Sequence, residues 1–125
     1  EPMDSLLNRV HRLRKADSTA VIIVSLHWGG EHTREPVSSQ PWDARQLIRA
    51  GADVLVCHHT HTLQSVDEIN GHSVFYSIGN FIFDQSRPEN TKACLVRLKI
   101  TAETVTTEAI PIEIKNCVPQ IVQHF

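Results

Sequence analysis

Apolar residues recur with helical spacing near the start of the chain and form short continuous runs farther along. Between residues 4 and 15, one helical face is apolar, with the positions Leu6, Leu7, Val10 and Leu13. Arginine and lysine fill most of the other face, so this stretch predicts an amphipathic helix with Asp4 or Ser5 as its N-cap. The β-branched run at residues 21–24 predicts a strand that is buried on both faces and ends before Gly29 and Gly30.

A second helix and a second buried strand follow in the same order. The helix is predicted from a cap, a first-turn proline, two buried positions and a stop: Ser39 or Gln40, Pro41, Leu47 with Ile48, and Gly51. Residues 53–57, DVLVC, are the next strand. Strand, helix and strand form a right-handed βαβ unit with parallel strands. The carboxyl ends of both strands therefore lie at one edge of the sheet, where open α/β sheets bind ligands.

The rest of the chain alternates between apolar and polar positions, as antiparallel strands do. Two short alternating runs flank Asn70 and Gly71, a dipeptide typical of a two-residue hairpin turn. Residues 91–114 predict a further antiparallel pair, and residues 84–91 a polar loop before it. The sequence therefore predicts an α/β fold over residues 1–125, in which a βαβ unit precedes antiparallel strands.

Composition narrows the classes of function. The net charge is −2, from 12 basic and 14 acidic residues, so nucleic acid is not an expected partner. The chain has three cysteines, Cys57, Cys94 and Cys117. Their odd number and the absence of CxxC spacing argue against a fold held by disulfide bonds. No apolar run approaches the ~20 residues that span a bilayer. The chain opens on Glu1 rather than methionine, so the absence of a signal or anchor says little.

Histidines stand at the end of each predicted parallel strand. His27 follows the first strand, and the second runs into His58, His59 and His61. If the backbone stays extended, His59 and His61 point to the same side and meet His27. Three imidazole nitrogens suit zinc, manganese, iron, nickel or copper, and they leave coordination positions open. The alternative is a cluster that satisfies hydrogen bonds at the strand end without metal.

Four other residues near these strand ends have roles that their spacing leaves open. His58 has three possible roles: it donates a hydrogen bond to a metal-ligand residue, it acts as a general acid, or its side chain is simply packed. Glu31 is a metal ligand, a base, a group that orients substrate, or a solvated loop carboxylate. Trp28 either stacks on a substrate or lies in the core, and Asn80 either marks a turn or turns back toward the site.

Two stretches together resemble the bacterial capsule synthesis protein CapA family, which serves poly-γ-glutamate capsule biosynthesis within the calcineurin-like metallophosphatase superfamily. They are VIIVSLHWGGEH and AGADVLVCHHTHTLQSVDEINGHSVFYSIGNFIFD, within roughly residues 20–84. The resemblance implies a layered α/β sandwich with a metal edge. It implies that His27 is the superfamily's late ligand histidine, and that His59 and His61 are its Gly-His-x-His pair.

Two further family motifs have counterparts in this chain. The family's HWG-x-E motif is similar to His27, Trp28, Gly29 and Glu31, and its SLGNF motif to residues 77–81, which implies that Asn80 lies near the site. Three positions depart from the family: Cys57 replaces glycine, Thr60 replaces proline, and His32 replaces an aromatic residue. Because only glycine takes a positive φ cheaply, Cys57 is expected to set this chain apart from its relatives.

The resemblance also implies that part of the site is supplied elsewhere. The superfamily's other ligands come from an N-terminal half, and nothing before residue 20 resembles them. Residues 1–125 are therefore expected to be the C-terminal part of a larger domain. With half the sandwich missing, an exposed sheet edge and apolar surface would make the isolated chain a homo-oligomer.

Three functions follow from the resemblance, all at the extracellular face of the bacterial membrane. The first is hydrolysis or transfer on a capsular polymer or phosphorylated precursor, with manganese, zinc or iron, dinuclear in the full-length protein, and with His58 or Glu31 handling protons. The second is a non-catalytic accessory subunit of a membrane polymer synthase or exporter. The third is a degenerate fold that binds metal only for stability.

Overall fold

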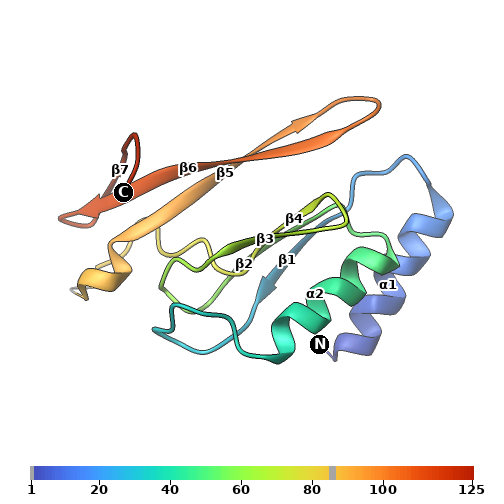
Figure 1. Ribbon diagram of the computed structural model, residues 1–125, viewed down its shortest axis with the longest axis horizontal. Helices are drawn as coiled ribbons and strands as arrows, with labels where there is room; N and C mark the ends of the chain where they lie inside the picture. The colour runs from blue at the N-terminus through green and yellow to red at the C-terminus, as the bar shows by residue number, and fades with distance from the viewer. Residues whose placement is uncertain (1, 85–86) are drawn as a thin grey trace.

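Two helices, a four-stranded sheet and a three-stranded sheet form three layers (Figure 1). The computed structural model describes residues 2–84 and 87–125. None of the described helices is long and apolar enough to cross a membrane. The elements in chain order are α1 (Met3–Ala16), β1 (Ile23–His27), α2 (Ser39–Ala50), β2 (Val54–His58), β3 (Val66–Ile69), β4 (His72–Phe75), the 3₁₀ helix η1 (Pro88–Asn90), β5 (Lys92–Ile100), β6 (Val105–Lys115) and β7 (Val118–Ile121).

The four-stranded sheet contains the predicted parallel unit. Its strand order is β1-β2-β4-β3, with β1, β2 and β4 parallel and β3 antiparallel to β4. The other sheet, β5-β6-β7, is entirely antiparallel. The predicted α/β class, a βαβ unit followed by antiparallel strands, is therefore confirmed. Strand β7 was not predicted.

Both helices occur where the periodicity predicts them, but their N-caps differ. Helix α1 starts after Pro2 and α2 after Ser38, and neither cap residue makes a side-chain hydrogen bond. The predicted caps are wrong because each helix begins earlier than the sequence suggested, which leaves those residues inside it. Gln40 instead uses its Oε1 to accept a hydrogen bond from the Val37 N–H, at 2.7 Å. Gly51 ends α2 with φ of 124°, as predicted.

The first strand is buried on one face only, so the prediction of burial on both faces is wrong. Val24 is buried beneath the helices, whereas Ile23 is 45 % exposed. The reason is the position of the second sheet. Its strand β5 packs over β2 and β4, where Val54, Phe75 and Cys94 form a separate core, and β1 lies at the sheet edge beyond that cover.

The predicted hairpin turn is confirmed. Asn70 and Gly71 connect β3 and β4 with φ of 50° and 80°, and Ile69 pairs with His72 across the turn. Positive φ at both central residues is what a two-residue hairpin with right-handed strand twist requires. The short connection places β3 beside β4, and β4 in turn pairs with β2.

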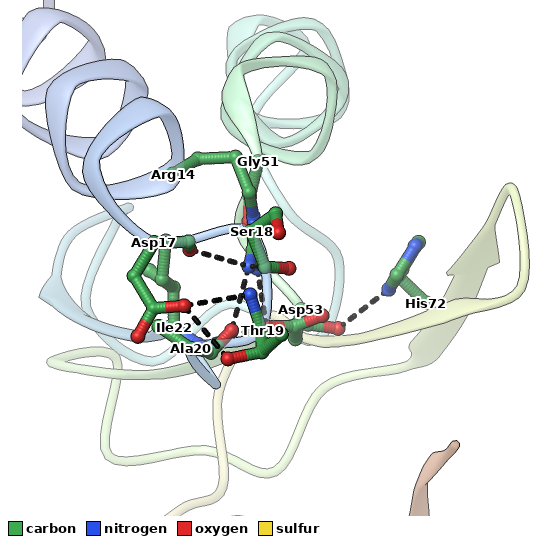
Figure 2. A network of polar contacts seen from close by, with 9 residues as sticks. All are labelled: Arg14, Asp17, Ser18, Thr19, Ala20, Ile22, Gly51, Asp53 and His72. Carbon is green, nitrogen blue, oxygen red and sulfur yellow. Dashed lines mark hydrogen bonds and ion pairs between the residues drawn. The ribbon is translucent and has the colours of Figure 1, made fainter. Parts of the chain in front are cut away.

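Arg14 ties the end of α1 to the amino ends of the parallel strands (Figure 2). Its Nη2 lies 2.8 Å from Asp53 Oδ2, and Nε donates to the Gly51 carbonyl at 3.1 Å. Asp53 Oδ2 also accepts the Ile22 N–H at 2.8 Å. A Cβ added at Gly51 would stand 2.6 Å from Arg14 Cβ, so glycine makes this approach possible. These bonds fix the end of the sheet opposite the histidines.

Replacing Arg14 by leucine is expected to lower the free energy of unfolding by about 2 kcal/mol, because Asp53 and several carbonyls lose a donor in a partly buried position. Urea unfolding measures the change. Arg97→Leu is the control, since its pair with Glu108 is exposed on both sides and contributes about 0.5 kcal/mol or less. Equal effects of the two substitutions would contradict the role given to Arg14.

Candidate functional site

The carboxyl ends of β1 and β2 bring three imidazoles together, as the parallel arrangement predicts. His27 and His58 are register partners, and their ring centroids are 5.1 Å apart. The rings of His27 and His59 are closer, at 4.3 Å. The Trp28 N–H donates to the His58 carbonyl at 2.9 Å and extends the pairing by one residue. Imidazoles of residues far apart in the sequence therefore share one sheet edge.

The backbone leaves the extended conformation directly after β2. His59 has φ of 119° and His61 has φ of 64°, so the premise that an extended chain aligns them is wrong. The ring of His59 faces His27, whereas that of His61 lies 6.5 Å from His59. Figure 1 shows this segment running from the end of β2 into the loop before β3. A tight turn, rather than strand alternation, decides where each imidazole lies.

Thr60 holds that turn from inside the protein. Its side chain is fully buried, and its hydroxyl donates to the Thr62 carbonyl at 2.7 Å and lies 2.9 Å from Ser77 Oγ. Its carbonyl accepts the His32 N–H at 2.7 Å. The Thr62 hydroxyl continues the chain of contacts to Asn90 Oδ1, also at 2.7 Å. Such buried polar groups stay favourable only while every partner is present.

Asn80 lies at the site, against His61. Its Oδ1 is 2.8 Å from His61 Nδ1, and its side-chain nitrogen donates to the Asn90 carbonyl at 3.4 Å. Because that carbonyl can only accept, the amide oxygen of Asn80 must face the imidazole. His61 therefore donates from Nδ1 and keeps the lone pair of Nε2. Metal-binding histidines are commonly oriented in this way by an oxygen acceptor.

Trp28 and Glu31 lie in different surroundings. The Trp28 indole packs on the helix-side core, stacks with Tyr76 at 6.2 Å and donates to the Tyr76 carbonyl at 3.1 Å. Glu31 is exposed in the loop after β1 and makes no hydrogen bond or ion pair within the described ranges. A role for either side chain in substrate binding or proton transfer stays a prediction.

Cys57, which stands where the family has glycine, does not have the positive φ that only glycine takes cheaply. It lies within β2, fully buried, and the positive φ falls on His59 two residues later. The expectation that Cys57 sets this chain apart from its relatives stays a prediction. Burial raises the pKa of its thiol to about 12. A thiol in this state is a small packed side chain rather than a nucleophile or ligand.

The surroundings of His58 disfavour a positive charge on its imidazole. Burial lowers its pKa below the ordinary value, and positive charge on His27 and His59 lowers it further. A like charge disfavours protonation in the same direction as desolvation does. His58 is therefore held in its neutral form more strongly than a solvent-exposed histidine.

The loop after β4 adds an exposed apolar group that the sequence analysis did not assign. Phe81, Ile82 and Phe83 are 48 %, 74 % and 41 % exposed, and the Phe83 ring lies 5.1 Å from that of His61. Three consecutive exposed apolar side chains beside polar imidazoles are unusual on a protein surface. The signal was present in the sequence as NFIFD, a run without the polar alternation of a surface strand.

The donor chemistry of the edge fits a divalent metal ion. Imidazole nitrogens suit Zn²⁺, Mn²⁺ and Fe²⁺, and His61 has its Nε2 left open by the bond to Asn80. Within residues 2–84 and 87–125, the histidine, cysteine and acidic side chains form no group of three that could hold an ion as placed.

The family model and the similar proteins point to the same family. Residues 2–85 match the family model described as "Bacterial capsule synthesis protein PGA_cap". "PGA biosynthesis protein CapA" of Bacillus subtilis is 37 % identical over 100 residues, which cover 79 % of this chain and 26 % of that protein. "Capsule biosynthesis protein CapA" of Bacillus anthracis is 33 % identical over 120 residues, covering 94 % and 29 %. The chain thus spans less than a third of the length of these relatives.

The lowered pKa of His58 predicts a specific dependence of stability on pH. Near pH 6.5, the ordinary pKa of histidine, His58 binds more protons in the unfolded chain than in the folded chain, because folding lowers its pKa. The free energy of unfolding is therefore not reduced by His58 above about pH 6.5, and it falls as the pH drops from there toward the pKa of the folded state. His58→Asn should remove this part of the slope, whereas His11→Asn on the exposed face of α1 should not.

Proton NMR of the imidazole Cε1–H signals measures the same effect directly. His58 should titrate below the ordinary value, and His27→Asn should move its midpoint partly back, because burial remains. A His58 midpoint at or above the ordinary value of about 6.5 would contradict the assignment.

Proposed function

Because this chain belongs to the bacterial capsule synthesis protein PGA_cap family, we propose that its histidine edge binds a divalent metal ion and supports hydrolysis or transfer on an acidic capsular substrate. The substrate is the capsular polymer, poly-γ-glutamate, or a phosphorylated precursor of it. The observation that carries the proposal is the 2.8 Å bond from His61 Nδ1 to Asn80 Oδ1, which leaves Nε2 open at the strand ends.

In this proposal, His27, His59 and His61 hold the ion through imidazole nitrogens, and Asn80 orients His61. Manganese, zinc or iron fits such a donor set. A bound ion supplies Lewis acidity toward a phosphoryl or carbonyl oxygen of the substrate. We further propose that residues 1–125 are part of a larger metallophosphatase-like domain, whose other segments complete a dinuclear site.

His58 is proposed to handle protons at this edge. Its neutral imidazole lies beside His27, and an unprotonated nitrogen can take up a proton from an attacking water. Because burial disfavours the resulting cation, His58 gives the proton up readily to a leaving group. Glu31 is the alternative base, since its carboxylate is exposed in the loop that follows His27 and Trp28.

The proposed place of action is the extracellular face of the bacterial membrane, where capsule is assembled. An acidic polymer carries repeated carboxylates, and a divalent ion at a histidine edge would attract them. Trp28 and Asn80 are proposed to line the substrate's path, Asn80 from its position beside His61.

Metal affinity tests the first proposal. Calorimetric titration of the protein with Mn²⁺ or Zn²⁺ should show binding that His59→Ala and His61→Ala abolish. Asn80→Ala should weaken it by about tenfold to a hundredfold, the usual effect of removing a hydrogen-bond partner of a ligand histidine. His11→Ala, on α1 away from the edge, is the matched control. Hydrolysis of bis(p-nitrophenyl) phosphate should follow the same order, and variants that keep full metal affinity and activity would refute the proposal.

A second candidate function is a non-catalytic accessory subunit of a membrane polymer synthase or exporter. The exposed run Phe81, Ile82 and Phe83 favours it, because an apolar patch rimmed by polar groups is typical of a protein contact surface. In this role the protein binds polymer or a synthase subunit, and metal chemistry is dispensable.

Capture of a detergent-solubilised capsule polymer synthase on the immobilised protein tests this second candidate. Ile82→Ser should reduce capture several-fold, and His61→Ala should leave capture and polymer production unchanged. Ile121→Ser in β7 is the matched control, since Ile121 is 69 % exposed but lies in the other sheet. Loss of polymer production in His61→Ala with capture intact would favour the catalytic proposal instead.

A further inference from the structure

The imidazole of His32 lies beside that of His61 and, like it, is held by a hydrogen bond to an asparagine side chain. The two rings are stacked, with centroids 5.8 Å apart and an interplanar angle of 27°. The His32 N–H donates to the Thr60 carbonyl at 2.7 Å, and its φ is 58°. His32 thus stands in a constrained backbone position on the same buried turn that places His61. The family resemblance assigns it no role, because an aromatic residue is common at its position.

The hydrogen bonds of the two imidazoles have opposite direction. Asn90 Oδ1 accepts the Thr62 hydroxyl, so the side-chain nitrogen of Asn90 faces His32 Nδ1, at 2.9 Å. That nitrogen can only donate, so His32 Nδ1 accepts and the ring hydrogen of the neutral imidazole lies on Nε2. His61 has the reverse arrangement, since its Nδ1 donates to Asn80 Oδ1. One ring therefore presents an Nε2 lone pair, and the other presents an Nε2–H.

Both rings are anchored to one buried pair of amides. Asn80 and Asn90 are 8 % and 2 % exposed, and the Asn80 side chain donates to the Asn90 carbonyl. Because Nδ1 of each ring is bound to this pair, Nε2 of each ring faces away from it. Two nearly parallel rings with a common anchor therefore direct a donor and an acceptor to the same region of the edge.

We propose that His32 is an anion-recognition residue, whose Nε2–H donates a hydrogen bond to a carboxylate or phosphate oxygen of the substrate held beside His61. The inference rests on the proposed function for the identity of the substrate, but the hydrogen-bond pattern does not depend on it. A hydrogen bond to a charged oxygen is stronger than a neutral one, so one well-placed donor contributes measurably to affinity. The resulting specificity is for acidic substrates.

Nitrogen NMR of the imidazoles tests the pattern without metal or activity. In chelator-treated protein labelled with ¹⁵N-histidine, His32 should show an unprotonated Nδ1 and a protonated Nε2, and His61 the reverse. His32→Asn and His61→Asn assign the signals, and asparagine suits both positions because it tolerates positive φ. A protonated Nδ1 on His32 would overturn the inference even if His61 binds metal as proposed.

Anion titration tests the recognition. Inorganic phosphate and a short γ-glutamyl oligomer are titrated into the wild type, His32→Asn and His32→Phe, with His11→Asn as the control. Both His32 variants should weaken binding roughly tenfold or more, the loss of one charge-assisted hydrogen bond. His32→Phe keeps a ring that can stack on His61. Equal losses of affinity in the two His32 variants would therefore show that the Nε2–H donor, and not stacking, binds the anion. The anion that binds the wild type more tightly indicates whether a phosphate or a polymer carboxylate is the substrate group. Unchanged affinity, or no binding of either anion to the wild type, would overturn the proposal.

Discussion

The site depends on one buried turn, held by the hydroxyl of Thr60. The residues directly before and after Thr60, His59 and His61, both have positive φ. This conformation costs of order 1–3 kcal/mol for each non-glycine residue. Each buried hydrogen bond returns about 1 kcal/mol, so the bonds of Thr60 to Thr62, Ser77 and His32 offset much of that cost. Without them, the chain after β2 has little reason to turn where it does.

Two polar clusters therefore hold the parallel sheet at its opposite ends. At the amino ends of the strands, Arg14 and Asp53 connect α1 with β1 and β2 (Figure 2). At the carboxyl ends, Thr60 and Asn90 connect the histidine turn with the segment after β4 and with η1. Apolar cores fill the space between, one under the helices and one between the sheets. The stable middle allows the carboxyl edge to carry strained backbone and clustered imidazoles.

Sequence periodicity was sufficient for the two α-helices and for the order of strands β1 to β6, because burial fixes the spacing of apolar residues, but it missed β7. It was not sufficient for features decided by neighbours in space. The burial of Ile23 depends on where β5 lies, and the start of α2 depends on Gln40 accepting the Val37 N–H. Strand alternation placed His59 and His61 on one side, but a turn with positive φ follows β2.

The partners of the histidines were equally hidden from the sequence. Asn90 lies in a polar loop, and nothing in its neighbours indicated that it would be buried beside His32 and Thr62. Such a residue becomes visible only when the loop is folded back on the sheet. In contrast, the family resemblance implied that Asn80 lies near the site, although its spacing from the strand alone left this open.

The central claim is that this turn presents His61 Nε2, together with His27 and His59, to a divalent ion. Crystals grown with Zn²⁺ and measured at the zinc absorption edge test it most directly. The account predicts an anomalous peak about 2.1 Å from imidazole nitrogens of these three residues, with Asn80 still bound to His61 Nδ1. A peak at other side chains, or none at this edge, would contradict it.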